Sequence, residues 1–155
     1  AIREFDDVLY LHKNPGRNGP EMRSRVGHRM PLARTGIGKA LLLDDSQEEW
    51  QRLYQVSLPV GGKNLHWPQH PEQSWEQFEQ RMREYVAGGY AFDLEDNEPS
   101  IRCVAAPVRD ASRRIVAGIS IASTVPYMPL EKMAELIPLV KQVAARLSAE
   151  LGAKA

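Results

Sequence analysis

The stretch IRCVAAPVRDASRRIVAGISIAST, residues 101–124, decides the fold. Its two ends, Ile101–Val108 and Ile115–Thr124, are dominated by β-branched and small apolar residues, which is typical of strands. Between them, Asp110–Arg114 is polar and has the length of a hairpin connection. The stretch therefore predicts two adjacent antiparallel strands.

The segments on both sides of this hairpin predict amphipathic helices. Residues 130–151 carry a broad apolar helical face; Gly152 should end this helix, and Pro138 should kink or restart it. Residues 74–88 predict a second helix, ended by a Gly-Gly pair at 88–89. Its apolar side chains recur at three- and four-residue spacing, at Trp75, Phe78, Met82 and Tyr85.

Two short strands are predicted near the N-terminus. Val8–Leu11 is an apolar run that a turn signal, Asn14-Pro15-Gly16, closes. Met22–Val26 alternates apolar and polar residues, so it should form a second strand, antiparallel to the first.

Two helices should follow these strands. Gly36–Leu43 is a helical stretch with Thr35 as its N-cap. Asp45 or Ser46 should cap the next helix, and its apolar face holds Trp50, Leu53 and Tyr54. After it, Ser57–Pro71 is dense in Pro and Gly and predicts a loop. The order of strands, helices, strands and helix predicts the α+β class, with helices packed on an antiparallel sheet.

The length, charge balance and cysteine content of the chain limit the functions that it can have. The chain of 155 residues fits one domain, 1–155, and its 20 Lys and Arg residues balance its 20 Asp and Glu residues. Direct DNA binding is not expected, because it needs a surplus of cations to replace phosphate counterions. A single cysteine favours a reducing, cytoplasmic compartment, and no apolar run approaches the ~20 residues that span a membrane. The chain starts without Met, which favours a fragment of a longer protein.

The sequence holds no strong enzyme motif. The stretch Gly36-Ile37-Gly38-Lys39 lacks the spacing of a phosphate-binding loop. His66 and His70 have the spacing of helical metal ligands, but Pro68 between them favours solvated loop residues. Cys103 lies in an apolar strand without a nearby His or second Cys, which is typical of a small buried residue and not of a nucleophile. We therefore expect no enzyme activity, no cofactor and no metal.

Two other segments indicate a ligand pocket. Thr35 followed by glycines opens a helix whose first N–H groups are unpaired, and such a helix start attracts anions. Asp93, Cys103 and Ser120 are placed where their side chains can converge beside an apolar sheet. An ordinary helix start and ordinary sheet residues explain the pattern equally well. The acidic residues of 93–98 fit no calcium loop and are typical of a solvated turn.

These segments resemble the IclR family of bacterial transcription regulators. GHRMPLARTGIGKA, residues 27–40, is similar to a family block with Gly-x-Arg-x-Pro-Leu followed by Thr-x-x-Gly-Lys-Ala. Residues 89–110 are similar to the block Gly-Tyr-Ala-x-Asp followed by Cys-Ile-Ala-x-Pro-Val-x-Asp. Val116–Ile121 resembles the next strand of the family. The blocks occur in order across residues 8–152.

The resemblance implies an α/β domain related to GAF domains, with a curved antiparallel sheet and a pocket for a small metabolite, usually a carboxylate. It also implies a homodimer or tetramer, whose effector changes operator DNA binding by an N-terminal winged helix-turn-helix domain that this chain lacks. The effector contacts that it implies are the capping Thr35, the backbone amides of Gly36 and Ile37, and the side chains of Asp93, Cys103 and Ser120.

Two positions depart from the family pattern. Ala122 is a further implied effector contact, but it stands where the family has a second ligand-binding Ser, so one ligand hydrogen bond is not expected there, although Ser123 is adjacent. Arg34 precedes the helix cap, where many members have a small residue. Because Arg can hold a carboxylate with two parallel hydrogen bonds, we predict that Arg34 contacts the effector, and a solvent-facing Arg is equally compatible with the sequence.

Three functions stay open at this point. The first is a sensor domain for a small carboxylate, and sugar acids, short keto acids and aromatic acids all fit the polar pattern. The second is a Cys-dependent redox enzyme on a GAF-like scaffold, using Cys103. The third is a purely structural dimerisation module, which would bind no ligand.

Overall fold

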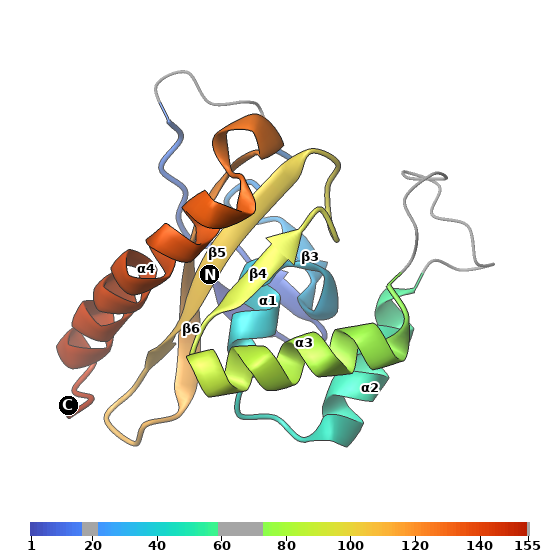
Figure 1. Cartoon of the computed structure of the whole chain (residues 1–155). Helices are drawn as coiled ribbons and strands as arrows, with labels where there is room; N and C mark the ends of the chain where they lie inside the picture. Colours follow the sequence, from blue (N-terminus) through green and yellow to red (C-terminus); the bar gives the residue numbers. More distant parts are fainter. Residues whose placement is uncertain (17–21, 59–72, 155) are drawn as a thin grey trace.

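Two three-stranded antiparallel sheets form the centre of the domain (Figure 1). The structure is a computed structural model, and it describes residues 1–16, 22–58 and 73–154. The strands are β1 (Ile2–Glu4), β2 (Asp7–Leu9) and β3 (Arg29–Pro31) in the first sheet, and β4 (Ala91–Leu94), β5 (Ile101–Arg109) and β6 (Ile115–Thr124) in the second. The main chains of Ala1 and Gly118 exchange hydrogen bonds of 3.0 and 2.9 Å, which join the first sheet to β6.

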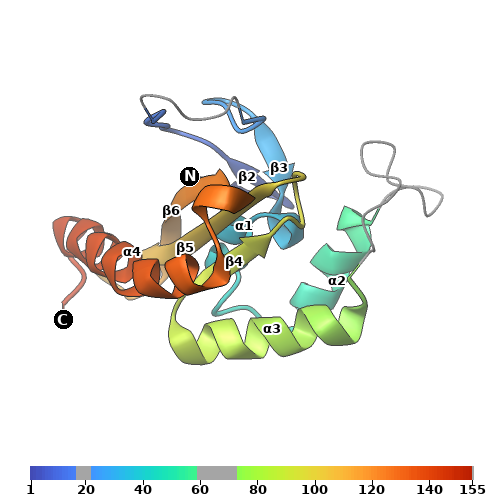
Figure 2. The same ribbon diagram turned by 45° about the horizontal axis from the view of Figure 1, so that its top comes forward.

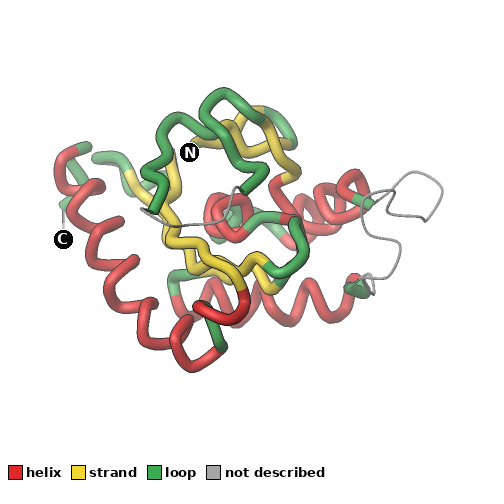
Figure 3. Tube along the Cα trace, turned by 90° about the horizontal axis from the view of Figure 1, so that it is seen from above, coloured by secondary structure: helices red, strands yellow, loops and turns green. Residues whose placement is uncertain are grey.

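Helices cover both faces of the second sheet. The helices are α1 (Gly36–Leu41), α2 (Gln47–Ser57), α3 (Trp75–Gly88) and α4 (Leu130–Glu150). In Figure 2, α4 lies on one side of β5 and α1 on the other. Seen from above in Figure 3, the strands separate the long α4 from the short α1 at the centre. The predicted α+β class, an antiparallel sheet with helices packed on it, is confirmed.

Each face of β5 has its own hydrophobic core. Val104, Ala106 and Val108 pack against the apolar face of α4. Ala105, which points to the opposite face, packs into a larger core with residues of α1, α2 and α3. The alternation of side chains along one strand therefore serves two separate cores, which is why 101–108 reads as a nearly continuous apolar run.

The start of α2 and both ends of α3 are capped, as predicted for Ser46 and for the glycines at 88–89. The Ser46 hydroxyl accepts a hydrogen bond of 3.3 Å from the Glu49 N–H at the start of α2. Ser74 and Gln77 form a reciprocal capping box at the start of α3. Gly89 ends α3 with a φ of 68°, in the left-handed region that favours glycine.

Pro138 does not restart the last helix, because α4 runs through it as one element. A proline inside a helix removes one main-chain hydrogen bond. Met133 lies before the proline and Val140 after it, and both are buried against the sheet. Packing on both sides of Pro138 thus holds the helix together.

The predicted strand Met22–Val26 is wrong. The partner of β2 is Arg29–Pro31, while residues 22–26 form no strand and Val26 is 59% exposed. Residues 22–26 alternate between apolar and polar side chains, but a strand also needs a neighbouring strand with which to form hydrogen bonds. These residues have no such neighbour in the described structure. The short strands β1 and β4 were not predicted.

The predicted loop at Ser57–Pro71 falls almost wholly outside the described residues, together with His66 and His70. In the described ranges, no helix combines the length and the apolar character needed to cross a membrane.

Candidate functional site

The start of α1 lies directly against the middle of β5. Thr35 has an extended backbone, and its hydroxyl accepts a hydrogen bond of 2.9 Å from the Gly38 N–H, as predicted for an N-cap. A Cβ added at Gly36 would lie 2.3 Å from the Cys103 Sγ and 3.1 Å from the Asp93 main-chain nitrogen. Only glycine therefore allows the helix to begin this close to the sheet.

Four of the predicted site residues share the face of the sheet that α1 covers. Asp93 on β4, Cys103 on β5 and Ala122 on β6 are direct cross-strand partners. Ser120 lies two residues before Ala122 and so points to the same face. The hairpin register thus brings together residues that are up to 29 positions apart in the chain, from 93 to 122.

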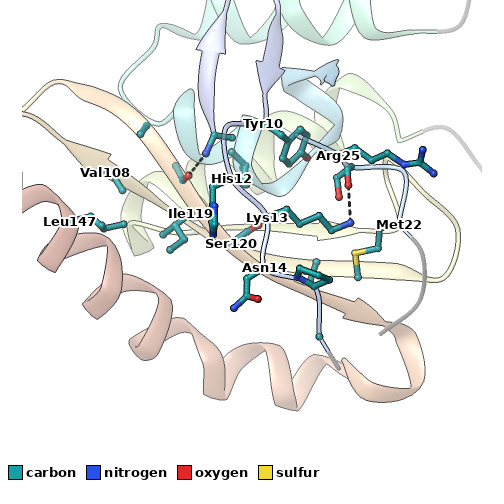
Figure 4. Close-up of a pocket in the computed structure, with 18 of the residues that line it drawn as sticks. Tyr10, His12, Lys13, Asn14, Met22, Arg25, Val108, Ile119, Ser120 and Leu147 are labelled. Atoms are coloured by element: carbon teal, nitrogen blue, oxygen red, sulfur yellow. Dashed lines mark hydrogen bonds between the residues drawn. The ribbon is translucent and has the colours of Figure 1, made fainter. Parts of the chain in front are cut away.

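A cavity of about 980 Å³ lies along β6, and its lining includes Ser120 and Ala122 of this face as well as Ile119 of the opposite face (Figure 4). Its walls are β6, the last turn of α4 and the strap, our name for residues 10–16 and 22–28 between β2 and β3. Ile37, Ser120 and Ala122 line the cavity. Thr35, Gly36, Asp93 and Cys103 are not part of its lining and are buried behind it.

Tyr10 separates the open cavity from these buried residues. It lines the cavity, and its hydroxyl lies near the Thr35 side chain, Asp93 and Cys103, which all affect its pKa. Its main chain continues the β2–β3 ribbon, through a hydrogen bond of 3.2 Å from the Tyr10 N–H to the His28 carbonyl. Burial, together with the nearby acidic groups, raises the pKa of Tyr10, so the hydroxyl stays protonated. Sequence reasoning missed this residue, because nothing near Tyr10 in the chain shows that it meets Thr35.

A buried lysine lies behind the candidate site. Lys39 on α1 is 1% exposed, and its Nζ donates to the Phe92 carbonyl at 3.1 Å and to the Asp96 carboxylate. Arg81 on α3 also contacts Asp96, at 3.3 Å. Burial acts to lower the pKa of Lys39, but Asp96 and Asp93 outweigh it and raise that pKa. Lys39 is therefore a charged group inside the core, paired with the Asp96 carboxylate.

This cluster corrects the prediction that the acidic residues of 93–98 form a solvated turn. Asp93 is 5% exposed and the Asp96 side chain 11%. The Asp93 Oδ1 accepts a hydrogen bond of 2.8 Å from the Asp96 N–H, which shapes the turn after β4. Both carboxylates can be buried because Lys39 supplies a buried counter-charge from a distant part of the sequence.

Burial raises the pKa of Asp93 to about 7; Lys39 opposes this shift and Asp96 adds to it. The folded domain therefore binds a proton that the unfolded chain releases near its usual pKa of 3.8. Between about pH 4 and pH 7 this difference makes the free energy of unfolding fall as the pH rises.

We expect Asp93→Asn to reduce this pH dependence, because asparagine does not ionise. The melting temperature of the parent, measured from pH 5 to pH 8, should fall more steeply than that of the variant. Asp44→Asn is the matched control, since Asp44 is 51% exposed at its side chain and lies outside the cluster. Parallel curves for the parent and Asp93→Asn would show that Asp93 is already ionised at pH 5.

The environment of Cys103 disfavours thiolate chemistry. Burial raises the pKa of the Cys103 thiol to about 12, and Asp93 adds to the shift. Lys39 and the backbone N–H groups of Asp93 and Gly36 act in the opposite direction but are outweighed. A protonated, buried thiol is a weak nucleophile, so the geometry supports a packing or ligand-contact role for Cys103.

Arg34 is occupied by main-chain acceptors. Its Nε donates to the Ser57 carbonyl at 3.2 Å, and its Nη1 lies 3.4 Å from the Asp96 carbonyl oxygen. These contacts tie the end of α2 to the turn after β4, and Arg34 does not line the cavity. Its contact with an effector stays a prediction.

Within the described ranges, no group of three or more His, Cys, Asp or Glu side chains is placed to hold a metal ion. The polar groups that the site offers are instead hydroxyls, backbone amides and cations of the strap. Such groups bind small polar or anionic molecules.

Comparisons with known proteins agree with this architecture. The family model described as "Bacterial transcriptional regulator IclR C-terminal" matches residues 1–149. The HTH-type transcriptional regulator KdgR of Escherichia coli (strain K12) is 29% identical over 147 residues, which are 95% of this chain and 54% of KdgR. The chain spans about half the length of the curated relatives that it matches.

Solved structures give the same result. The Agobacterium tumefaciens repressor BlcR is 28% identical, with a TM-score of 0.83 over 99% of this chain and 59% of that one. The Thermotoga maritima IclR is 26% identical, with a TM-score of 0.80 over 97% of this chain and 59% of that one. The matched relatives are transcription regulators. The family match, the curated relatives and these structures together show that the chain belongs to the IclR family of transcriptional regulators, as its C-terminal, effector-binding domain.

Proposed function

We propose that this domain senses a small carboxylate, and that the bound effector changes operator DNA binding by a helix-turn-helix domain outside these residues. The observation that carries the proposal is the cavity of about 980 Å³ that Ser120, Ala122 and Ile37 line, directly beside the start of α1. The volume is in the range of small-molecule sites.

The chemistry of the cavity favours an anion. The strap contributes the cations Lys13 and Arg25, whereas Glu150 is the one acidic side chain among the described residues that line the cavity. The Ser120 hydroxyl can donate to a carboxylate. At the start of α1 the Gly38 N–H is bonded to Thr35, and Ile37 is the helix residue that reaches the cavity. This arrangement supports the effector contacts that the sequence predicts at Ile37, Ser120 and Ala122.

Coupling to DNA requires that the effector bind two arrangements of the whole regulator with different affinity. We propose that the whole regulator is a homodimer or tetramer. The zero net charge of this domain agrees with the proposal, because the cations that contact DNA phosphates would then lie on the helix-turn-helix domain.

The test is a thermal-shift screen of the domain with small carboxylates. A ligand at a hundred times its Kd adds about 2.7 kcal/mol to the free energy of unfolding, a shift in melting temperature of roughly 5–10 °C. For a carboxylate that binds, Ser120→Ala should weaken the affinity about five- to tenfold, because one hydrogen bond is lost.

Ser112→Ala is the matched control, since Ser112 lies in the exposed hairpin turn and bonds only with its neighbours there. It should leave ligand affinity unchanged. If no carboxylate shifts the melting temperature, the sensor proposal fails and the purely structural dimerisation module takes its place. If ligands bind and Ser120→Ala behaves like the control, they occupy another site.

A further inference from the structure

The strap cations and the aliphatic side chains at the end of α4 lie at different ends of the cavity. Figure 4 shows Tyr10, Lys13, Arg25 and Met22 toward one end, Val108 and Leu147 at the other, and Ser120 between them. Both strap cations therefore lie at the same end. A ligand with charge at one end only would have a defined orientation in such a cavity.

Lys13 is placed to hold an anionic group. Its side chain is half-buried, and its Nζ donates a hydrogen bond of 2.7 Å to the Ser24 carbonyl on the other side of the strap. An ammonium has three donors, and among the described residues the Ser24 carbonyl is bonded to one of them. Because Lys13 is anchored and shielded in part from water, its charge acts on a ligand more strongly than that of a mobile surface lysine.

The opposite end of the cavity offers few polar partners. Val108 and Ile119 belong to the sheet face that packs against α4, and Leu147 and Leu151 extend the apolar wall along the helix. Leu147 and Leu151 are 41% and 50% exposed, which leaves apolar surface for a ligand to cover. Glu150 lies at this end and would repel a second carboxylate.

We propose that the effector is an amphipathic carboxylate, with its acidic group toward Lys13 and Arg25 and an apolar body along Ile119 toward Leu147. The proposal rests on the proposed function and narrows it. Short keto acids leave the apolar end unfilled, and the hydroxyls of sugar acids find few partners there. Lys13 and Leu147 are then the residues that select the effector.

The experiment measures the Kd of straight-chain monocarboxylates of two to eight carbons by calorimetry, with gluconate as the polyhydroxylated comparison. Affinity should rise about three- to fourfold for each methylene that is buried, and gluconate should bind more weakly than hexanoate. Leu147→Ser should flatten this dependence on chain length without changing the affinity for acetate.

The charge is tested with the tightest-binding acid and its primary amide. Lys13→Gln should weaken the acid about three- to tenfold and leave the amide unchanged, whereas Lys13→Arg should retain acid binding. Arg23→Gln is the matched control, because Arg23 is an exposed cation of the same segment that does not line the cavity.

The outcomes separate the two proposals. If carboxylates bind in a Ser120-dependent way but gluconate or acetate equals octanoate, or Lys13→Gln affects acid and amide alike, this inference is overturned and the sensor proposal stands. If no member of the series binds and gluconate does not bind, both are overturned.

Discussion

Replacing Lys39 by methionine is expected to lower the free energy of unfolding by roughly 3–5 kcal/mol, because it leaves the buried Asp96 carboxylate without its buried counter-charge. Methionine fills a similar volume, so the loss reports the charge and not a void. Lys39 is 1% exposed and bonds to both the Phe92 carbonyl and the Asp96 carboxylate. Urea denaturation followed by circular dichroism measures the change.

Two variants separate this effect from a general loss of packing. Arg81→Met removes the partly exposed cation that also contacts Asp96, and it should cost less than about 1 kcal/mol. The double variant Lys39→Met, Asp96→Asn should be more stable than Lys39→Met alone, because one unpaired charge is gone. A Lys39→Met domain within about 1 kcal/mol of the parent would mean that the Asp96 carboxylate is not ionised in the fold.

The second large effect is expected at Gly38, where alanine should lower the free energy of unfolding by roughly 3 kcal/mol or more. A Cβ at this position would lie 2.0 Å from the Leu32 carbonyl oxygen and 2.6 Å from two other main-chain atoms of Leu32. Main-chain atoms cannot rotate away as a side chain can. The turn Leu32–Arg34 or α1 would therefore have to move.

Helix propensity alone predicts the opposite sign, since alanine is favoured over glycine by about 1 kcal/mol inside a helix. The control is Ala87→Gly on the exposed side of α3, which should cost no more than about 1 kcal/mol. If Gly38→Ala were neutral or stabilising in the same denaturation experiment, the close approach of Leu32 to α1 would be disproved.

Secondary structure was predicted correctly where the residues that stabilise an element lie close together in the sequence. The helix at Trp75–Gly88 was predicted from its apolar spacing and a terminal Gly-Gly pair, which all lie within one short segment. The β5–β6 hairpin was predicted because both strands and their connection are contiguous. In both cases the residues that stabilise the element are neighbours in the chain.

The wrong predictions concern residues whose structure depends on a segment far away in the sequence. Residues 22–26 alternate like a strand but have no neighbouring strand to pair with. The acidic residues at 93 and 96 were predicted to be solvated, because their buried partner Lys39 lies more than 50 positions earlier. A single sequence does not show such pairs.

Some residues of the candidate site were identified from the sequence, and others were not. The resemblance brought Gly36, Asp93 and Cys103 to one place, and the structure shows them in contact or as cross-strand partners. Tyr10 and Lys13 were not identified, since they come from the strap, and no short motif marks a residue that covers a site from a loop. Whether these side chains bind an effector is the subject of the experiments above.

The absence of a side chain at Gly36 limits which residues near the cavity can be substituted without disturbing the fold. At this position α1 offers only main chain to Cys103 and Asp93 on the sheet, so a side chain added at Gly36 would disturb the packing of the helix start. The strap and β6 line the cavity with side chains and are not held by such a contact. A redesign of the cavity for another ligand should therefore begin with those residues and keep the helix start constant.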